Sequence, residues 1–183
     1  MRRRPMLLRF LLVLAAALRQ PRVAATEEIR TRHRCWPWDC DANFHMNDGR
    51  FVSVSGLARV ALMMRLGLFP RFRHDGWRPI ASAAEVRYFR EIRPLARFQI
   101  RTRIVTWDEK YFVFEHLFEL AGRDGPVAAA RILVRSLFRR RSGPIPTAEV
   151  LASIGFAGPR PEPAEEIRHW MELSELMRRR RAS

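Results

Sequence analysis

The segment from Phe51 to Leu68 constrains the fold more than any other part of the sequence, because it is apolar on nearly every face of a helix. A surface helix keeps one polar face, so this helix has to be wrapped by the rest of the chain. Asn47 or Asp48 can cap its start, and Gly67 can end it. Small residues are spaced along it: Ser53, Ser55, Gly56, Ala58 and Ala61. We therefore predict a fold built around one buried helix.

A cluster of polar side chains comes directly before this helix: Asp39, Asp41, Asn43, His45, Asn47 and Asp48. At a helix start, unpaired backbone N–H groups and the positive end of the helix dipole face any bound molecule. Alternating carboxylate, carboxamide and imidazole groups supply a base or nucleophile, an orienting group and a second proton carrier. The pattern favours acyl transfer. The alternative is that these residues only shape a turn and cap the helix.

The run D-x-D-x-N-x-H-M-N, residues 39–47, followed by a buried helix, resembles the hotdog-fold thioesterases. The resemblance is greatest to the 4-hydroxybenzoyl-CoA thioesterase-like branch and its small bacterial acyl-CoA thioesterase relatives. It implies a CoA or acyl-carrier thioester as substrate, and Asp41 takes the position of the nucleophile or general base. Asn43 and His45 match alternating positions of plant acyl-carrier-protein thioesterases. The run WDEKYF, residues 107–112, resembles the turn between the third and fourth strands of the bacterial relatives.

Three positions depart from the family pattern. Phe44 replaces the usual Gly before the motif His, and Asp48 replaces the second Asn of H-x-N-N. The acidic residue often carried on the central helix corresponds here to Gly56 or Leu57. The resemblance therefore leaves open which residue orients the attacking water.

From these residues we expect thioester hydrolysis in which Asp41 either attacks the thioester carbonyl itself or activates a water molecule. Asn43 and His45 are expected to orient the nucleophile or the substrate. The expected oxyanion and substrate-binding positions follow at the helix start: Asn47, Asp48 and Gly49. The histidines lack ligand-like spacing, and no phosphate-binding glycine motif occurs, so we expect neither a metal nor a cofactor.

Alternating apolar and polar residues predict strands at residues 26–38, 79–92, 98–107, 111–120 and 127–139. Short turns between the last three imply antiparallel pairing. One buried helix followed by four strands gives an α+β fold, an antiparallel sheet curled around a long central helix. The resemblance names this the hotdog fold. A basic loop is expected at 71–78 and a linker at 142–146, with helices at 147–154 and 164–177.

We divide the chain into a basic and apolar N-terminal helix (1–25), a hotdog thioesterase domain (26–141) and a C-terminal helical extension with a basic tail (142–183). The strands are apolar on both faces, which is more surface than one helix covers. Hotdog domains generally pair through their sheets with the active site at the interface. The resemblance therefore implies a homodimer or a dimer of dimers.

Residues 1–22 combine an apolar stretch with flanking arginines. Met6 to Leu18 falls short of the ~20 residues of a spanning helix, and Arg9 interrupts it. The segment fits a signal peptide, a helix packed on the domain or a partner, or a helix lying on an anionic membrane surface. We favour the last, with Arg9 among the arginines that attract headgroups. We expect a cytoplasmic protein with peripheral membrane contact.

The net charge of +15 is carried almost entirely by arginine, since Lys110 is the only lysine. Such a surface attracts anions, whether CoA phosphates, anionic lipid or nucleic acid, of which nucleic acid is the least expected partner. Cys35 and Cys40 are expected to be reduced thiols, because their spacing does not suit a zinc site.

Two other functions compete with thioester hydrolysis. One is a hydratase or dehydratase on the same fold. That group carries D-x-N-P-x-H, in which His follows Asp by five residues, whereas His45 follows Asp41 by four. The other is a non-enzymatic hotdog protein that binds acyl chains, lipid surfaces or nucleic acid, which arginines interleaved with aromatics would support.

Overall fold

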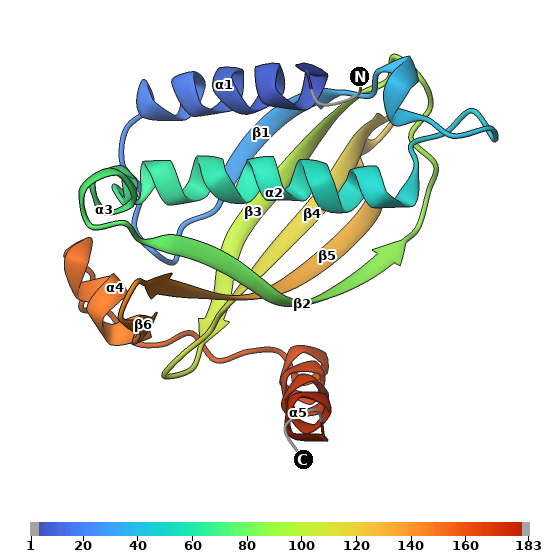
Figure 1. The fold of residues 1–183 in the computed structure, drawn as a ribbon. Helices are drawn as coiled ribbons and strands as arrows, with labels where there is room; N and C mark the ends of the chain where they lie inside the picture. The colour runs from blue at the N-terminus through green and yellow to red at the C-terminus, as the bar shows by residue number, and fades with distance from the viewer. Residues whose placement is uncertain (1–3, 181–183) are drawn as a thin grey trace.

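An antiparallel sheet curls around a central helix, α2 (Asp48–Arg65), in this computed structural model, which describes residues 4–180 (Figure 1). Five strands follow the order β1-β3-β4-β5-β2, and a short strand, β6, pairs with β5. Their bounds are β1 Ile29–Arg34, β2 Arg78–Tyr88, β3 Arg97–Trp107, β4 Phe112–Gly122, β5 Gly125–Arg140 and β6 Gly143–Ile145. Each of these pairings is antiparallel. The predicted α+β fold is confirmed.

Helix α2 begins at Asp48 because Asn47 caps it, its side-chain oxygen accepting a hydrogen bond from the Gly49 amide at 3.0 Å. The helix is followed by Gly67, whose φ of +84° is a conformation that glycine adopts without strain. The side chains that it buries include Phe51, Val54, Leu57, Ala58, Ala61 and Leu62. The predicted buried central helix is confirmed, with both ends three residues earlier than the segment 51–68.

The inner face of the sheet packs against α2 through the alternate residues that the sequence indicated. On β4, Phe112, Phe114, His116 and Phe118 are all buried. On β3, a bulge between Ile104 and Thr106 shifts the alternation, so that Trp107 joins Ile104 in the inner core, while Val105 is buried on the opposite face. The alternation of apolar and polar residues therefore predicted the inner face, but it gave no sign of the bulge.

Three short elements lie where the sequence predicted a strand end, a loop and a linker. The 3-10 helix η1 (Pro37–Asp39) follows β1, which stops at Arg34 instead of residue 38. Helix α3 (Phe69–His74) occupies part of the predicted basic loop, and its Phe72 ring stacks on Phe138 with ring centres 6.2 Å apart. Strand β6 lies in the predicted linker, where Ile145 pairs with Phe138. Packing on β5 stabilises both α3 and β6, and no local pattern reveals it.

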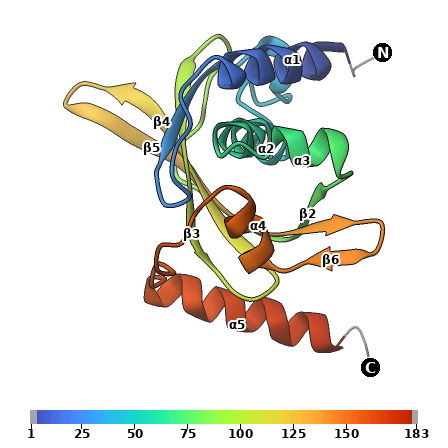
Figure 2. The same ribbon diagram turned by 90° about the vertical axis from the view of Figure 1, so that its left-hand side faces the viewer.

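Helix α5 (Glu165–Arg180) covers part of the outer face of the sheet (Figure 2), and α4 (Thr147–Ser153) precedes it. Ile167 is buried there against Val105, Val113 and Leu133. Leu176, farther along the helix, is 58% exposed. Since α5 covers part of this face, apolar residues on both sides of the strands do not by themselves require a second subunit.

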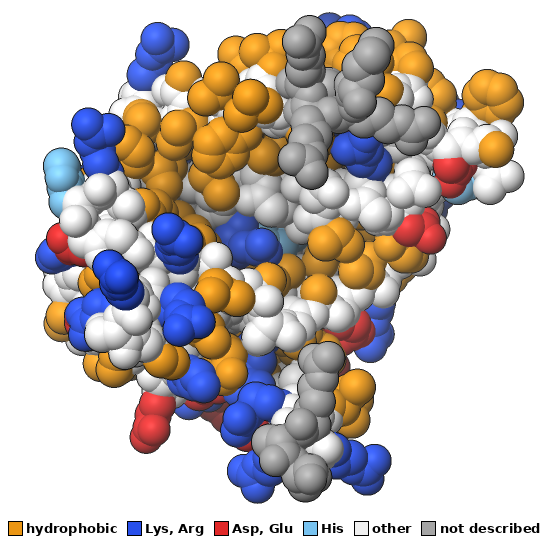
Figure 3. All heavy atoms as spheres, viewed as in Figure 1, with side chains coloured by type: hydrophobic (Ala, Val, Ile, Leu, Met, Phe, Trp, Pro, Cys, Tyr) orange, Lys and Arg blue, Asp and Glu red, His pale blue; other side chains and the backbone are white. Residues whose placement is uncertain are grey.

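Helix α1 (Arg4–Leu18) lies alongside α2, as Figures 1 and 2 show. Ala17 is buried, and Val13 and Leu14 pack against the core. The opposite side of α1 is exposed, and Figure 3 shows hydrophobic side chains gathered over it. Its exposed leucines are Leu7, Leu8, Leu11 and Leu12.

The described helices include none that is both long and apolar enough to cross a membrane. The structure describes most of the segment 1–22 whose membrane contact the sequence suggested, but residues 1–3 of it lie outside the described part. Residues 181–183, with the last arginine of the basic tail, also lie outside it.

Candidate functional site

The predicted catalytic residues share one tight turn, residues 40–46, which we call the Asp41 turn. Its ends are held by an isolated antiparallel bridge between Cys40 and Met46. Inside it, the Asp41 amide donates to the His45 carbonyl at 3.1 Å, and the Phe44 amide donates to the Asp41 carbonyl at 3.2 Å. The turn therefore fixes the backbone of Asp41 and His45 relative to each other.

The Asp41 carboxylate lies between the two other candidate residues. Its Oδ1 accepts a hydrogen bond from the Asn43 amide at 2.9 Å and lies 3.8 Å from His45 Nδ1. The side chains of Asp41 and His45 are 27% and 32% exposed, so solvent or a bound molecule reaches them. The structure thus brings Asp41, Asn43 and His45 together, although through the backbone of Asn43 and not through its carboxamide.

The start of α2 offers fewer free amides than the sequence suggested. The Asn47 amide donates to the Asp39 carbonyl at 2.9 Å, and the Gly49 amide donates to Asn47 Oδ1 at 3.0 Å. Of the three expected oxyanion positions, only Asp48 has an amide that donates no hydrogen bond within residues 4–180. The helix cap and the expected oxyanion site compete for the same N–H groups.

Asp39 anchors the Asp41 turn to two helices. Its carboxylate is 1% exposed and accepts hydrogen bonds from Arg9 of α1 at 3.1 and 2.6 Å and from the Trp36 amide at 2.9 Å. Arg50 of α2 lies 3.7 Å away. Arg9 therefore faces the domain and is not available to lipid headgroups, which corrects that part of the membrane interpretation. An arginine inside an apolar helix was the one signal in the sequence for this contact.

Residues 35–170 match the sequence pattern of the thioesterase-like superfamily. The chain belongs to the thioesterase-like superfamily. Protein THEM6 of Xenopus laevis is 32% identical over 139 residues, which are 76% of this chain and 65% of that protein. Protein THEM6 of Danio rerio is 32% identical over 135 residues, 74% and 64% of the two chains. This thioesterase-like chain thus spans just under two thirds of the length of these relatives.

Solved structures described as thioesterases share the fold. The 4-hydroxybenzoyl-CoA thioesterase from Pseudomonas sp. strain CBS-3 superposes with a TM-score of 0.63 at 15% identity, over 70% of this chain and 99% of that one. A probable thioesterase from Bartonella henselae gives a TM-score of 0.58 at 16% identity, over 66% and 98%. The hotdog fold expected from the sequence is confirmed.

The departure of this thioesterase-like chain at Phe44 has a backbone consequence. Phe44 has a φ of +57°, a left-handed conformation that favours the glycine usual in the motif. Its side chain is 78% exposed, so packing contacts do not offset the cost of this backbone conformation. The hydrogen bonds of the Asp41 turn hold the residue in this conformation.

Two cysteines lie at the base of the Asp41 turn as free thiols, with their sulfur atoms 3.5 Å apart. Burial and the hydrogen bond to Cys40 raise the pKa of Cys35 to about 12. Between residues 4 and 180, no three His, Cys, Asp or Glu side chains gather where they could hold a metal ion.

Proposed function

We propose that this protein hydrolyses acyl-CoA thioesters, with Asp41 as the general base or nucleophile. The observation that carries the proposal is the Asp41 turn, which holds a partly exposed carboxylate beside His45 at the start of a buried helix. Membership of the thioesterase-like superfamily and the name of the Pseudomonas structural neighbour support it.

In the proposed mechanism the thioester carbonyl lies over the start of α2, where the Asp48 amide and the helix dipole stabilise negative charge on its oxygen. Asp41 removes a proton from water, or attacks the carbonyl carbon itself, and a carbon–oxygen bond forms. The tetrahedral intermediate then collapses and the carbon–sulfur bond breaks. After attack by water, the protonated Asp41 returns its proton to the departing sulfur, so that the free acid and the CoA thiol are released. After attack by Asp41 itself, the CoA sulfur takes up a proton from solvent, and the acyl group stays on Asp41 as a mixed anhydride that water then hydrolyses. His45 orients the Asp41 carboxylate from 3.8 Å.

The decisive experiment replaces Asp41 with Asn, which keeps the shape and the hydrogen bond from the Asn43 amide. We expect a loss of at least ~100-fold in kcat on a panel of acyl-CoA thioesters, measured by thiol release, because general-base catalysis contributes that much. Asp75→Asn is the matched control, since Asp75 forms an exposed ion pair with Arg71 away from the Asp41 turn. A folded Asp41→Asn protein with full activity would sink the assignment.

A second variant and a second substrate separate the alternatives. His45→Ala should lower kcat if the imidazole assists proton transfer, and should raise only KM if it binds substrate. Acyl-carrier-protein thioesters tested beside the CoA panel decide which carrier is used. An enoyl-CoA that gains water without releasing thiol would mean a hydratase, and tight acyl binding without turnover would mean a non-enzymatic protein.

The proposed assembly is a homodimer joined through the free edge of β2. Within the described residues β2 pairs with β5 alone, which leaves an eleven-residue edge unpaired. Tyr88 and Phe89 at its end are 45% and 53% exposed. A stable monomer at micromolar concentration in sedimentation equilibrium would contradict this arrangement.

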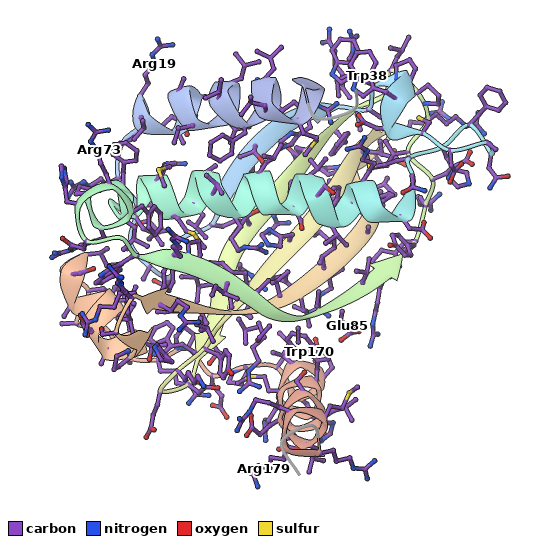
Figure 4. All side chains as sticks on the ribbon, viewed as in Figure 1. Arg19, Trp38, Arg73, Glu85, Trp170 and Arg179 are labelled. Atoms are coloured by element: carbon purple, nitrogen blue, oxygen red, sulfur yellow. The ribbon has the colours of Figure 1, made fainter. Side chains whose placement is uncertain are left out.

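The proposed location is the cytoplasm, with contact to the membrane surface through the exposed side of α1. Trp38 lies beside α1 (Figure 4), is 53% exposed and extends the patch formed by the α1 leucines. Tryptophan favours the membrane–water interface, and leucines add apolar affinity. Replacing Leu8 and Leu12 by Asp should abolish co-sedimentation with anionic vesicles. Unchanged binding would exclude α1 as the contact.

A further inference from the structure

Arg59, in the middle of α2, differs from the other buried and partly buried arginines between residues 4 and 180. Each of the others bonds a carboxylate or a backbone carbonyl: Arg9, Arg50, Arg65, Arg71, Arg101, Arg131, Arg135 and Arg140. Arg59 does neither among the described residues, and its guanidinium lies 6.0 Å from the ring centre of Phe114. Burial lowers the pKa of Arg59, as expected for a cation that has lost water without gaining an anion.

His116 on β4, close to Arg59, is also incompletely paired. Its side chain is 0% exposed, and Nδ1 lies 3.0 Å from Thr102 Oγ1, but Nε2 has no hydrogen-bond partner among the described residues. Burial, and then the Arg59 cation, hold the pKa of His116 well below its usual value. The imidazole is therefore neutral, and the pair carries a single positive charge. Buried polar groups in folded proteins are nearly always paired, so the absence of an anion beside Arg59 and His116 among residues 4–180 marks the pair as a candidate ligand site.

A recess separates this part of α2 from β2. Helix α2 packs on β1, β3, β4 and β5. It meets β2 at its start, where the ring centres of Phe51 and Tyr88 are 5.2 Å apart, and the middle of β2 bows away from the helix (Figure 1). Figure 3 shows the surface hollowed between α2 and β2, with Lys or Arg and His side chains at its floor. Along α2, the residues Val52, Gly56 and Arg59 share one face, and none of the three is fully buried. The space beside Gly56 is open, because a Cβ there would meet only Arg59 Nη2, at 4.0 Å.

We propose that this recess binds the acyl chain of the substrate and that Arg59 binds a carboxylate at the far end of that chain. The substrate class is then the mono-CoA thioester of a dicarboxylic acid, an assignment that rests on the proposed thioester hydrolysis. A guanidinium pairs with a carboxylate through two parallel hydrogen bonds. One carboxylate also balances the single charge of the pair, whereas a phosphate dianion would leave an excess negative charge beside it.

The position of Arg59 on α2 sets the chain length. Arg59 follows Asp48 by eleven positions, which corresponds to roughly 16 Å along the helix axis. Helical side chains point back toward the helix start, so the guanidinium shortens this span. An extended chain advances about 1.2 Å per bond, by the geometry that limits the protein backbone. Chains of roughly 8 to 14 carbons therefore join a thioester at the Asp41 turn to a carboxylate at Arg59.

The test compares two CoA thioesters of equal length, those of dodecanedioic acid and dodecanoic acid. The wild-type protein should favour the dicarboxylate by roughly tenfold or more in kcat/KM, the factor that one charge-assisted hydrogen bond supplies. Arg59→Met should remove or reverse this preference. Arg73→Met, which removes an equal charge from the exposed side of α3, should keep it. A wild-type protein without the preference, or an Arg59→Met protein that retains it, overturns the proposal.

A binding measurement keeps this test separate from the proposed hydrolysis. Thioether analogues of the same two CoA esters cannot be hydrolysed, and their affinities follow from calorimetry. Tighter binding of the carboxylate analogue to wild type than to Arg59→Met supports the Arg59 site even if no thioester is turned over. If Arg59→Met instead weakens the dimer and leaves the ratio of affinities unchanged, the guanidinium pairs with a second copy of the chain, and the proposal is wrong.

Discussion

Replacing Arg9 by Met should destabilise the fold far more than a surface position would. Met fills much of the space of the arginine stem but removes both hydrogen bonds to the Asp39 carboxylate, which is 1% exposed. A buried charge that loses its partner typically costs about 3–5 kcal/mol. Arg50 at 3.7 Å and the Trp36 amide at 2.9 Å still face Asp39. We therefore expect the lower end, about 3 kcal/mol.

Urea unfolding followed by circular dichroism measures this difference. With a denaturant slope of about 2 kcal/mol per molar urea, the midpoint should fall by about 1.5 M. Arg19→Met is the control, because Arg19 lies exposed just beyond the end of α1 (Figure 4) and should change stability by less than about 0.5 kcal/mol. In an Asp39→Asn background, Arg9→Met should cost much less, since the two side chains act as a pair. Equal midpoints for Arg9→Met and Arg19→Met would refute the reasoning.

Two further predictions concern buried titratable groups. The pKa of His116 is far below 6.5, so only the unfolded chain takes up this proton as the pH falls below that value. The free energy of unfolding should then drop by up to ~1.4 kcal/mol per pH unit because of this residue. His116→Asn should flatten this dependence of the unfolding free energy on pH, whereas the control His74→Asn, at an exposed residue, should not. In the folded protein iodoacetamide should label Cys40 before Cys35, because burial and the bond to Cys40 raise the pKa of Cys35 to about 12; peptide mapping that finds Cys35 labelled first would contradict this.

The central helix, the inner face of the sheet and the Asp41 turn were predictable because their signals are local. Apolar residues without a polar face predicted burial of the helix, and alternation predicted the strands. The Asp39 anchor was not predictable, since Arg9 reaches it from 30 residues away and only the fold brings the two together. The oxyanion amides were over-predicted for a different reason. Asn47 has the residue type of a cap, and a cap consumes the N–H groups that an oxyanion site needs.

The placement of Arg59 illustrates the same limit. In the sequence Arg59 is one of many arginines and stands in a mostly apolar segment. Nothing local separates it from the arginines that form ion pairs. Arg59 differs from them because no carboxylate pairs with it among residues 4–180. This absence is visible only after every packed element is in place. Charge counting therefore predicted an anion-attracting surface but could not distinguish Arg59 from the other arginines.

Because α5 follows all the strands in the sequence, the part of the outer face that it covers closes late during synthesis. Ile167 packs on Val105, Val113 and Leu133, and the ribosome adds it 34 residues after Leu133. At ordinary elongation rates this interval is roughly 2–7 s, and the exit tunnel lengthens it. For that time the nascent sheet presents apolar side chains on its outer face and an unpaired β2 edge. A chaperone that shields extended apolar segments would act on this protein before α5 emerges, and slow codons between residues 133 and 167 would lengthen its exposure.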